Sequence, residues 1–298
     1  MAFGYGATFT RVFDAAAAQA LAAFVFYFAI PIMLFRSMAS ANLPDQIPWG
    51  YLLSYYIGVA AVFATGMGLA GAWFGGSLER RAITGFGGAF GNTVLLGIPL
   101  VLTSFGEAAS LPLFLMLAFH STLLFAGITV VIEVGRGSRQ GLRELPLKVV
   151  AGLASNPVLW GLLGGIAFNL LGLRLPGTLE RFAALIGGVA VPCALFSVGA
   201  SLRAYRLRGA LPPAALMVAL KLVAQPLIVW ALVSFVFTVP PLWAKVAVLL
   251  AALPVGVNVY LFAVRYDAGQ AESASAILLS SVLSVATLAL VLLWLGPA

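Results

Sequence analysis

The sequence predicts an all-α polytopic membrane protein with nine transmembrane helices. Its 298 residues are 62% hydrophobic and only 8% charged, whereas a soluble domain is roughly half apolar and about a quarter charged. The apolar residues form nine stretches, each long enough for the roughly 20 residues that cross a hydrocarbon core. An unpaired backbone group in lipid costs several kcal/mol, so each stretch is expected to be helical. The stretches are roughly 15–35, 50–74, 82–104, 109–132, 149–172, 182–202, 210–237, 246–264 and 273–295.

The charge and motif content exclude several classes of protein. The net charge is +7, but Lys and Arg lie in brief links and form no continuous basic stripe, so we expect no nucleic-acid partner. Cys193 is the only cysteine, so neither a disulfide nor a cysteine-based metal site forms within one chain. The H-E-x-x-H and G-x-S-x-G motifs are absent. We therefore predict no enzyme activity, no metal and no cofactor.

The basic residues predict an orientation in a cytoplasmic (inner) membrane, because cytoplasmic links carry the excess of Lys and Arg. If the stretches alternate in direction, eleven basic residues fall on one side and four on the other. This places the N-terminus inside and the C-terminus outside. The inside group is Arg11, Arg80, Arg81, Arg136, Arg139, Arg143, Lys148, Arg203, Arg206, Arg208 and Arg265, and the outside group is Arg36, Arg174, Arg181 and Lys245.

A repeat relates the two halves of the chain, which meet at the longest link, residues 133–148. Residues 29–35 and 190–196 share alanine, proline, leucine and phenylalanine at a constant offset of 161. The two stretches run in opposite directions, so common ancestry would give inverted-topology repeats, as in many secondary transporters. The alternative is chance similarity between two helices rich in the same residues. Under the repeat, stretches one to four match six to nine, and a span before residue 1 would be the partner of the fifth.

Two stretches are predicted to break in mid-membrane. Residues 91–99 contain two glycines and a proline, and residues 254–258 contain Pro254 and Gly256. Proline removes a backbone donor, and glycine lowers the cost of unwinding. The offset of 161 places both breaks at matching depths, where half-helix N-termini would attract an anion. The alternative is that both are simple kinks. The residues expected to bind substrate are Asn92, Thr93, Gly97, Pro99, His120, Pro254, Gly256 and Asn258.

Two ionisable side chains lie within predicted spans. His120, the only histidine, could bind a carboxylate or carry a proton, or be a neutral interhelical hydrogen bonder. Lys221 could balance the charge of an anion, or extend its ammonium to the membrane surface. No Asp or Glu lies in the middle of a stretch. Proton or sodium coupling therefore stays open but has no midplane carboxylate to support it.

The sequence resembles the auxin efflux carrier family, which includes plant auxin exporters and bacterial malate or malonate permeases. The similarity covers nearly the whole chain. It is carried in order by residues 25–31, 91–93 with 97–100, 155–157, 195–199 and 251–254. The resemblance implies ten helices in two inverted five-helix repeats, with the fourth and ninth helices broken and crossing. It also implies a scaffold part, a moving transport part, and a carboxylate bound between them.

The chain departs from the family pattern at its start. Residues 4–6 resemble the end of the first helix of the family, so most of that helix is missing here. Either the true start lies upstream, or this is a nine-helix form like some relatives in the bile acid transporter superfamily. A homodimer contact is left open by the missing helix. The scaffold part is expected at 1–49 and, with a cytoplasmic linker, 134–208, and the transport part at 50–133 and 209–298.

The resemblance places Asn92, His120 and Asn258 at positions that bind substrate in the family, and His120 replaces the amide that is common there. We therefore predict a secondary transporter that moves a small organic anion, a carboxylate, by alternating access. Its partners would be that anion and the lipid bilayer. The alternative is a passive channel or a non-transporting membrane receptor for an organic anion.

Overall fold

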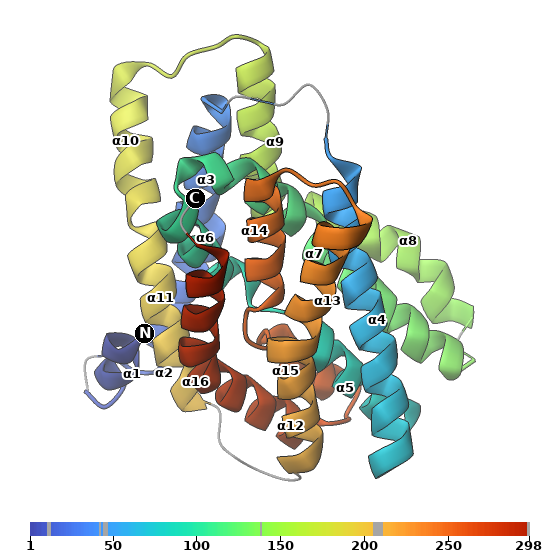
Figure 1. Ribbon diagram of the computed structural model, residues 1–298. Helices are drawn as coiled ribbons and strands as arrows, with labels where there is room; N and C mark the ends of the chain where they lie inside the picture. Colours follow the sequence, from blue (N-terminus) through green and yellow to red (C-terminus); the bar gives the residue numbers. More distant parts are fainter. Residues whose placement is uncertain (11–12, 42, 44–46, 138, 205–210, 297–298) are drawn as a thin grey trace. The chain divides into compact units, whose positions relative to one another are not determined.

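The computed structural model describes residues 1–10, 13–41, 43, 47–137, 139–204 and 211–296, and these residues are helical apart from turns and short links (Figure 1). Within these ranges the only β-type pairing is one isolated bridge. Three basic residues of the predicted inside group, Arg11, Arg206 and Arg208, lie outside the described residues. The prediction of an all-α protein is confirmed for the described part of the chain.

Six described helices are long and apolar enough to cross a membrane. A seventh candidate is a pair of helices, Arg143–Ala154 and Pro157–Leu170, bent by 61°. Two further apolar helices, Thr93–Phe105 and Pro241–Ala251, are shorter. The protein is therefore a multi-pass membrane protein. The six long helices are Ala16–Ala39, Trp49–Phe74, Glu107–Gly135, Gly177–Ser201, Leu211–Val236 and Gln270–Leu295.

The chain forms two compact units. Unit 1 comprises Met1–Ile47, Val94–Phe119 and Val150–Ala204. Unit 2 comprises Pro48–Thr93, His120–Val149 and Tyr205–Ala298. Helix α7 (Ser110–Gly135) contributes to both units.

Unit 1 is built on close helix packing. Its helices are α1 (Ala2–Ala7), α2 (Ala15–Phe24), α3 (Ile30–Ala39), α6 (Ile98–Phe105), α9 (Pro157–Leu170), α10 (Gly177–Gly188) and α11 (Ala190–Ser201). A Cβ on Gly161 of α9 would lie 2.4 Å from the carbonyl oxygen of Pro31 in α3, and one on Gly165 would lie 2.6 Å from that of Phe35. Only a residue without a side chain permits such an approach of two membrane helices.

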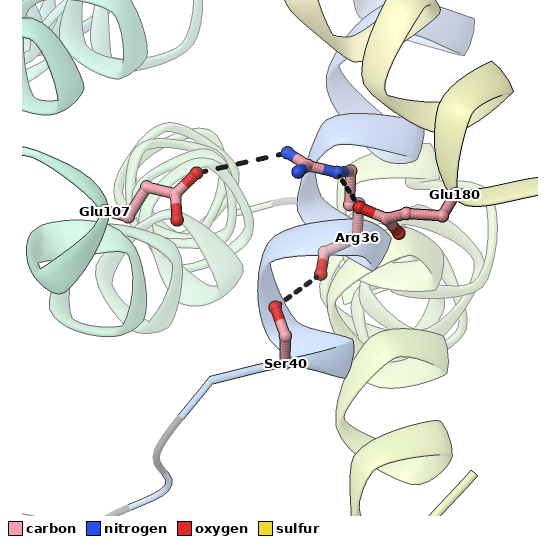
Figure 2. Close-up of polar contacts among 4 residues, drawn as sticks. All are labelled: Arg36, Ser40, Glu107 and Glu180. Atoms are coloured by element: carbon pink, nitrogen blue, oxygen red, sulfur yellow. Dashed lines mark hydrogen bonds and ion pairs between the residues drawn. The ribbon is translucent and has the colours of Figure 1, made fainter. Parts of the chain in front are cut away.

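Polar side chains form hydrogen bonds and ion pairs near the ends of helices in unit 1. The Asn156 side chain accepts a hydrogen bond from Val158 N–H at 3.0 Å and caps α9. Arg36 of α3 donates through Nε to Glu180 of α10 at 2.6 Å, and its Nη1 lies 4.0 Å from a carboxylate oxygen of Glu107 (Figure 2). The Ser40 hydroxyl donates to the Arg36 carbonyl at 3.2 Å. The Arg36 contacts tie α3 to α10 and to the start of η3 (Glu107–Ala109).

Seven helices lie wholly in unit 2. They are α4 (Trp49–Phe74), α5 (Leu78–Ala89), α12 (Leu211–Ala219), α13 (Gln225–Ala231), α14 (Pro241–Ala251), α15 (Asn258–Arg265) and α16 (Gln270–Leu295). Arg80 at the start of α5 pairs with Glu272 at the start of α16. Glu79 pairs with Arg136, just beyond α7, at 2.7 Å. The start of α5 is thus ionically linked to two other segments of unit 2.

Widened helical turns accompany the prolines. The π-helical segments η1 (Val25–Ala29), η2 (Thr93–Gly97) and η5 (Leu220–Ala224) each lead directly into a helix with proline in its first turn. Proline within a helix clashes with the carbonyl of the preceding turn, and a π-helical turn moves that carbonyl away. These spans therefore continue through Pro31, Pro99 and Pro226.

The predicted link at residues 133–148 is helical for most of its length. Helix α7 continues to Gly135, and α8 spans Arg139–Ala154 with Pro146 inside it. Its charged residues support the helix, because Glu144 and Lys148 are one turn apart and pair at 2.7 Å. The stretch 149–172 consequently begins inside α8 and is interrupted by the 61° bend before α9.

Candidate functional site

Both predicted helix breaks are present, and both contribute to unit 2. Helix α5 ends at Ala89, and Phe90 is extended, with φ −92° and ψ 113°, before helical structure resumes at Thr93. Helix α14 ends at Ala251, and α15 begins at Asn258. The two predicted interruptions are therefore confirmed. The first is at residues 90–92, since helical structure continues from Thr93 through Pro99, and the second is at residues 252–257.

The two breaks meet backbone to backbone. Gly91 and Val255 form an antiparallel bridge. Asn92 N–H donates to the Pro254 carbonyl at 2.9 Å, and Gly256 N–H donates to the Phe90 carbonyl, also at 2.9 Å. In a membrane every unwound backbone group needs a partner, and each break supplies partners for the other. We call this pairing of residues 90–92 with 254–256 the crossover.

A third helix completes the crossover. Val255 N–H donates to the Ser280 hydroxyl of α16 at 3.1 Å, and that hydroxyl in turn donates to the Ile277 carbonyl at 3.2 Å. Residue patterns did not lead us to Ser280. The buried serines on one side of α16, which also include Ser273 and Ser284, are the sequence signal that could have found it.

Glycine is required where the two breaks touch. A Cβ on Gly256 would lie 2.5 Å from Cδ1 of Phe90 and 2.9 Å from the carbonyl oxygen of Gly91. A Cβ on Gly91 would lie 3.1 Å from Cε of Lys221. Gly256 was predicted as a site residue for its role in unwinding, whereas Gly91 was noted only as part of the break.

The helices that leave the crossover present their N-terminal ends. No side chain caps α15. Two of its first N–H groups already have backbone partners, since Val259 N–H donates to the Gly256 carbonyl and Tyr260 N–H to the Val257 carbonyl, both at 3.1 Å. The positive end of the helix dipole attracts anions. Asn258 is the first residue of α15, and Asn92 directly precedes η2. Both Asn residues are partly exposed, whereas Thr93, Pro254 and Gly256 are buried.

His120 packs against Phe90 of the crossover. Its ring stacks on Phe90 with centroids 4.9 Å apart, and its Nδ1 lies 3.4 Å from the Tyr55 hydroxyl of α4. The side chain is fully buried. Unit 2 therefore brings His120 to the same break as Asn92, and the contact with α4 fits the interpretation as an interhelical hydrogen bonder. Tyr55 was not among the predicted residues, because nothing in the sequence around it marks a non-local partner.

Lys221 also reaches the crossover. It lies in η5, is fully buried, and its Nζ donates to the carbonyl of Ala251 at the end of α14. The interpretation that the ammonium extends to the membrane surface is therefore wrong. Gly97 and Pro99 are the predicted residues that unit 2 does not include, since they belong to unit 1 at the junction of η2 and α6.

The fold and this site define a multi-pass helical membrane protein with two broken helices paired at their breaks. A family model described as "Membrane transport protein" matches residues 1–292. The chain belongs to this membrane transport family, and the resemblance to the auxin efflux carrier family is confirmed.

Two relatives carry transporter names. A protein of Rhizobium meliloti named "Putative malonate transporter" is 28% identical over 268 residues, which is 89% of this chain and 82% of the relative. An "Uncharacterized transporter" of Methanothermobacter thermautotrophicus is 30% identical over 202 residues, which is 67% of this chain and 63% of the relative.

Proposed function

We propose that this protein is a secondary transporter that moves a small organic anion across the membrane by alternating access, with the anion bound at the crossover. The observation that carries the proposal is the pairing of the two breaks through Asn92 N–H and Gly256 N–H. This pairing satisfies the unwound backbone and leaves the positive dipole ends of η2 and α15 beside Asn92 and Asn258. Backbone amides at such ends bind anions without a metal or cofactor.

The substrate class we propose is a carboxylate. Asn92 and Asn258 offer side-chain amide donors beside the helix ends, and neither side chain hydrogen-bonds another described residue. Carboxylates accept such hydrogen bonds strongly because they are charged. The name of the Rhizobium meliloti relative supports a small carboxylate, and malonate is the first candidate. Thr93, His120, Pro254 and Gly256 complete the proposed site within unit 2. Gly97 and Pro99 remain predicted substrate-binding residues.

Inverted repeats and nine spans are the membrane architecture we propose. Helix α4 and the segment Leu211–Val236 are both 26 residues long and begin 162 residues apart, from Trp49 to Leu211. Helices α7 and α16 are also both 26 residues long and begin 160 residues apart, from Ser110 to Gln270. These matching lengths support the repeat. An inner-membrane location with the N-terminus inside completes the proposal.

Alternating access requires one part to move against another. We propose that stretches two to four and seven to nine move against a scaffold formed by one, five and six. The grouping of α4, α5 and α12 to α16 in unit 2 supports a common moving part for these helices, whereas Val94–Phe119 group with unit 1. The scaffold ranges 1–49 and 134–208, the transport ranges 50–133 and 209–298, and a homodimer remain predictions.

Counterflow in proteoliposomes tests the transporter proposal. Vesicles loaded with unlabelled malonate, succinate or malate are diluted into a trace of the labelled acid, and protein-free vesicles are the control. A carrier takes up label transiently above equilibrium, because internal substrate accelerates exchange. Uptake without trans-acceleration but with high conductance would identify a channel. Binding without any flux would identify a receptor.

A further inference from the structure

The crossover contains a buried cationic side chain, that of Lys221. Lys221 has no exposed surface, and its Nζ donates to the carbonyl of Ala251, the last residue of α14. A Cβ on Gly91 would lie 3.3 Å from the same Nζ, so the ammonium also packs against the backbone that follows α5. Lys221 thus lies against both segments of the crossover, on the side where α5 and α14 end.

The C-terminal ends of two helices, both with partial negative charge, lie at this ammonium. The last carbonyls of a helix carry a partial charge of about −0.5, and α5 and α14 both terminate at the crossover. Broken-helix transporters commonly bind their coupling cation with unwound carbonyls and half-helix C-termini. A sodium ion and an ammonium group compete for such a position, because both bind carbonyl oxygen as compact cations.

We infer that Lys221 is a resident counter-cation that occupies the position of a mobile sodium ion, so that this protein binds and moves its anion without sodium. The statement about transport rests on the proposed function. The electrostatic role of Lys221 rests on the fold alone and is tested separately.

Gln225 makes the inference testable by chemical rescue. It follows Lys221 by four residues on the same helical span and is fully buried, and its amide oxygen and nitrogen have no hydrogen-bond partner among the described residues. Truncation of Lys221 to alanine would leave a cavity bordered by the Ala251 carbonyl. We expect the Gln225 amide oxygen to be an additional ligand there. Sodium prefers such oxygen ligands, and methylammonium reproduces the end of the lost side chain.

The first experiment measures melting temperature in detergent without substrate. Wild type, Lys221→Ala, Lys221→Met and the control Lys148→Ala, which removes an exposed lysine of α8, are compared in choline, sodium and methylammonium chloride at equal concentration. We expect wild type and Lys148→Ala to be insensitive to the cation. Lys221→Ala should melt lower in choline and recover in sodium or methylammonium, whereas Lys221→Met fills the cavity and should not recover.

A wild-type melting temperature for Lys221→Ala in choline would overturn the counter-cation role. If Lys221→Ala yields folded protein only when purified in sodium or methylammonium, the role is supported. If it folds in none of the three salts while Lys221→Met melts like wild type, the charge is not needed and the role is overturned.

The second experiment measures malonate counterflow by wild type in sodium and in choline. We expect rates within about twofold of each other, and a loss of tenfold or more in choline would overturn sodium independence. If malonate, succinate and malate all fail to exchange in either salt, the proposed function fails. The melting experiment still decides the role of Lys221 in that case.

Discussion

Replacing Gly256 with alanine tests the crossover most directly. The added Cβ would lie 2.5 and 2.6 Å from two ring carbons of Phe90, whereas carbon atoms pack at about 3.5–4.0 Å. The ring would therefore have to move by roughly 1 Å. It is not free to do so, because Phe90 contacts Phe86 at 5.0 Å, Phe125 at 5.4 Å and His120 at 4.9 Å between ring centroids.

The backbone offers no easier relief. The same Cβ would lie 2.9 Å from the Gly91 carbonyl oxygen. Moving the segment of residues 90–92 away would stretch the hydrogen bond from Gly256 N–H to the Phe90 carbonyl. Overpacking of this kind costs about 1–3 kcal/mol. If the site is distorted by the same free energy, the dissociation constant of the carboxylate rises roughly 5- to 150-fold, since about 1.4 kcal/mol corresponds to a factor of ten.

The assay is calorimetric binding of malonate in detergent, with counterflow as the second measurement. Gly68→Ala in α4 is the matched control, because a Cβ at Gly68 meets nothing within 4 Å. In that open position alanine should be neutral or stabilising by up to about 1 kcal/mol. Wild-type affinity and stability of Gly256→Ala beside a normal control would refute the reasoning that the two breaks are locked together at this residue.

Three further predictions follow from other contacts. Asn92→Ala and Asn258→Ala should each weaken carboxylate binding by tenfold or more while the protein stays monodisperse, because hydrogen bonds to charged groups contribute about 1.5–3 kcal/mol. Calorimetry with uptake decides this, and wild-type affinity in both variants would remove them from the site. The Arg136 guanidinium, which hydrogen-bonds the carboxylate, lowers the pKa of Glu79 below its ordinary value of 4.5. The stabilisation from a depressed carboxyl pKa is present above 4.5 and lost as the pH falls through the folded-state value. Wild type should therefore melt above Glu79→Gln at pH 7, and the difference should shrink below pH 4.5; a gap that stays constant with pH would contradict the pairing. Gly161→Ala places a Cβ 2.4 Å from a carbonyl oxygen of α3 and should lower the melting temperature without changing affinity in the protein that remains folded.

Sequence patterns predicted the local features of this fold and missed the non-local ones. The breaks were predictable because Pro254, Gly256 and the residues around Gly91 act on their own backbone. The partners in the crossover were not, since the hydrogen bond from Val255 to Ser280 joins residues on different helices. Charge patterns marked residues 133–148 as a link but did not show that it contains most of α8. A cluster of Arg, Glu and Lys resembles a loop in a hydropathy profile, even where an ion pair such as Glu144–Lys148 supports a helix.

Lys221 shows why a single residue type could not be interpreted before its position was known. A lysine ten residues into a span has a side chain long enough to reach either a surface or a neighbouring helix end. The π-helical turn η5 and Pro226 in the turn that follows fix the span so that the ammonium meets the Ala251 carbonyl. The crossover is thereby divided by charge. Its cation contacts the carbonyl end of α14, while no described side chain caps the amide end of α15, and that asymmetry favours an anionic substrate over a cationic one.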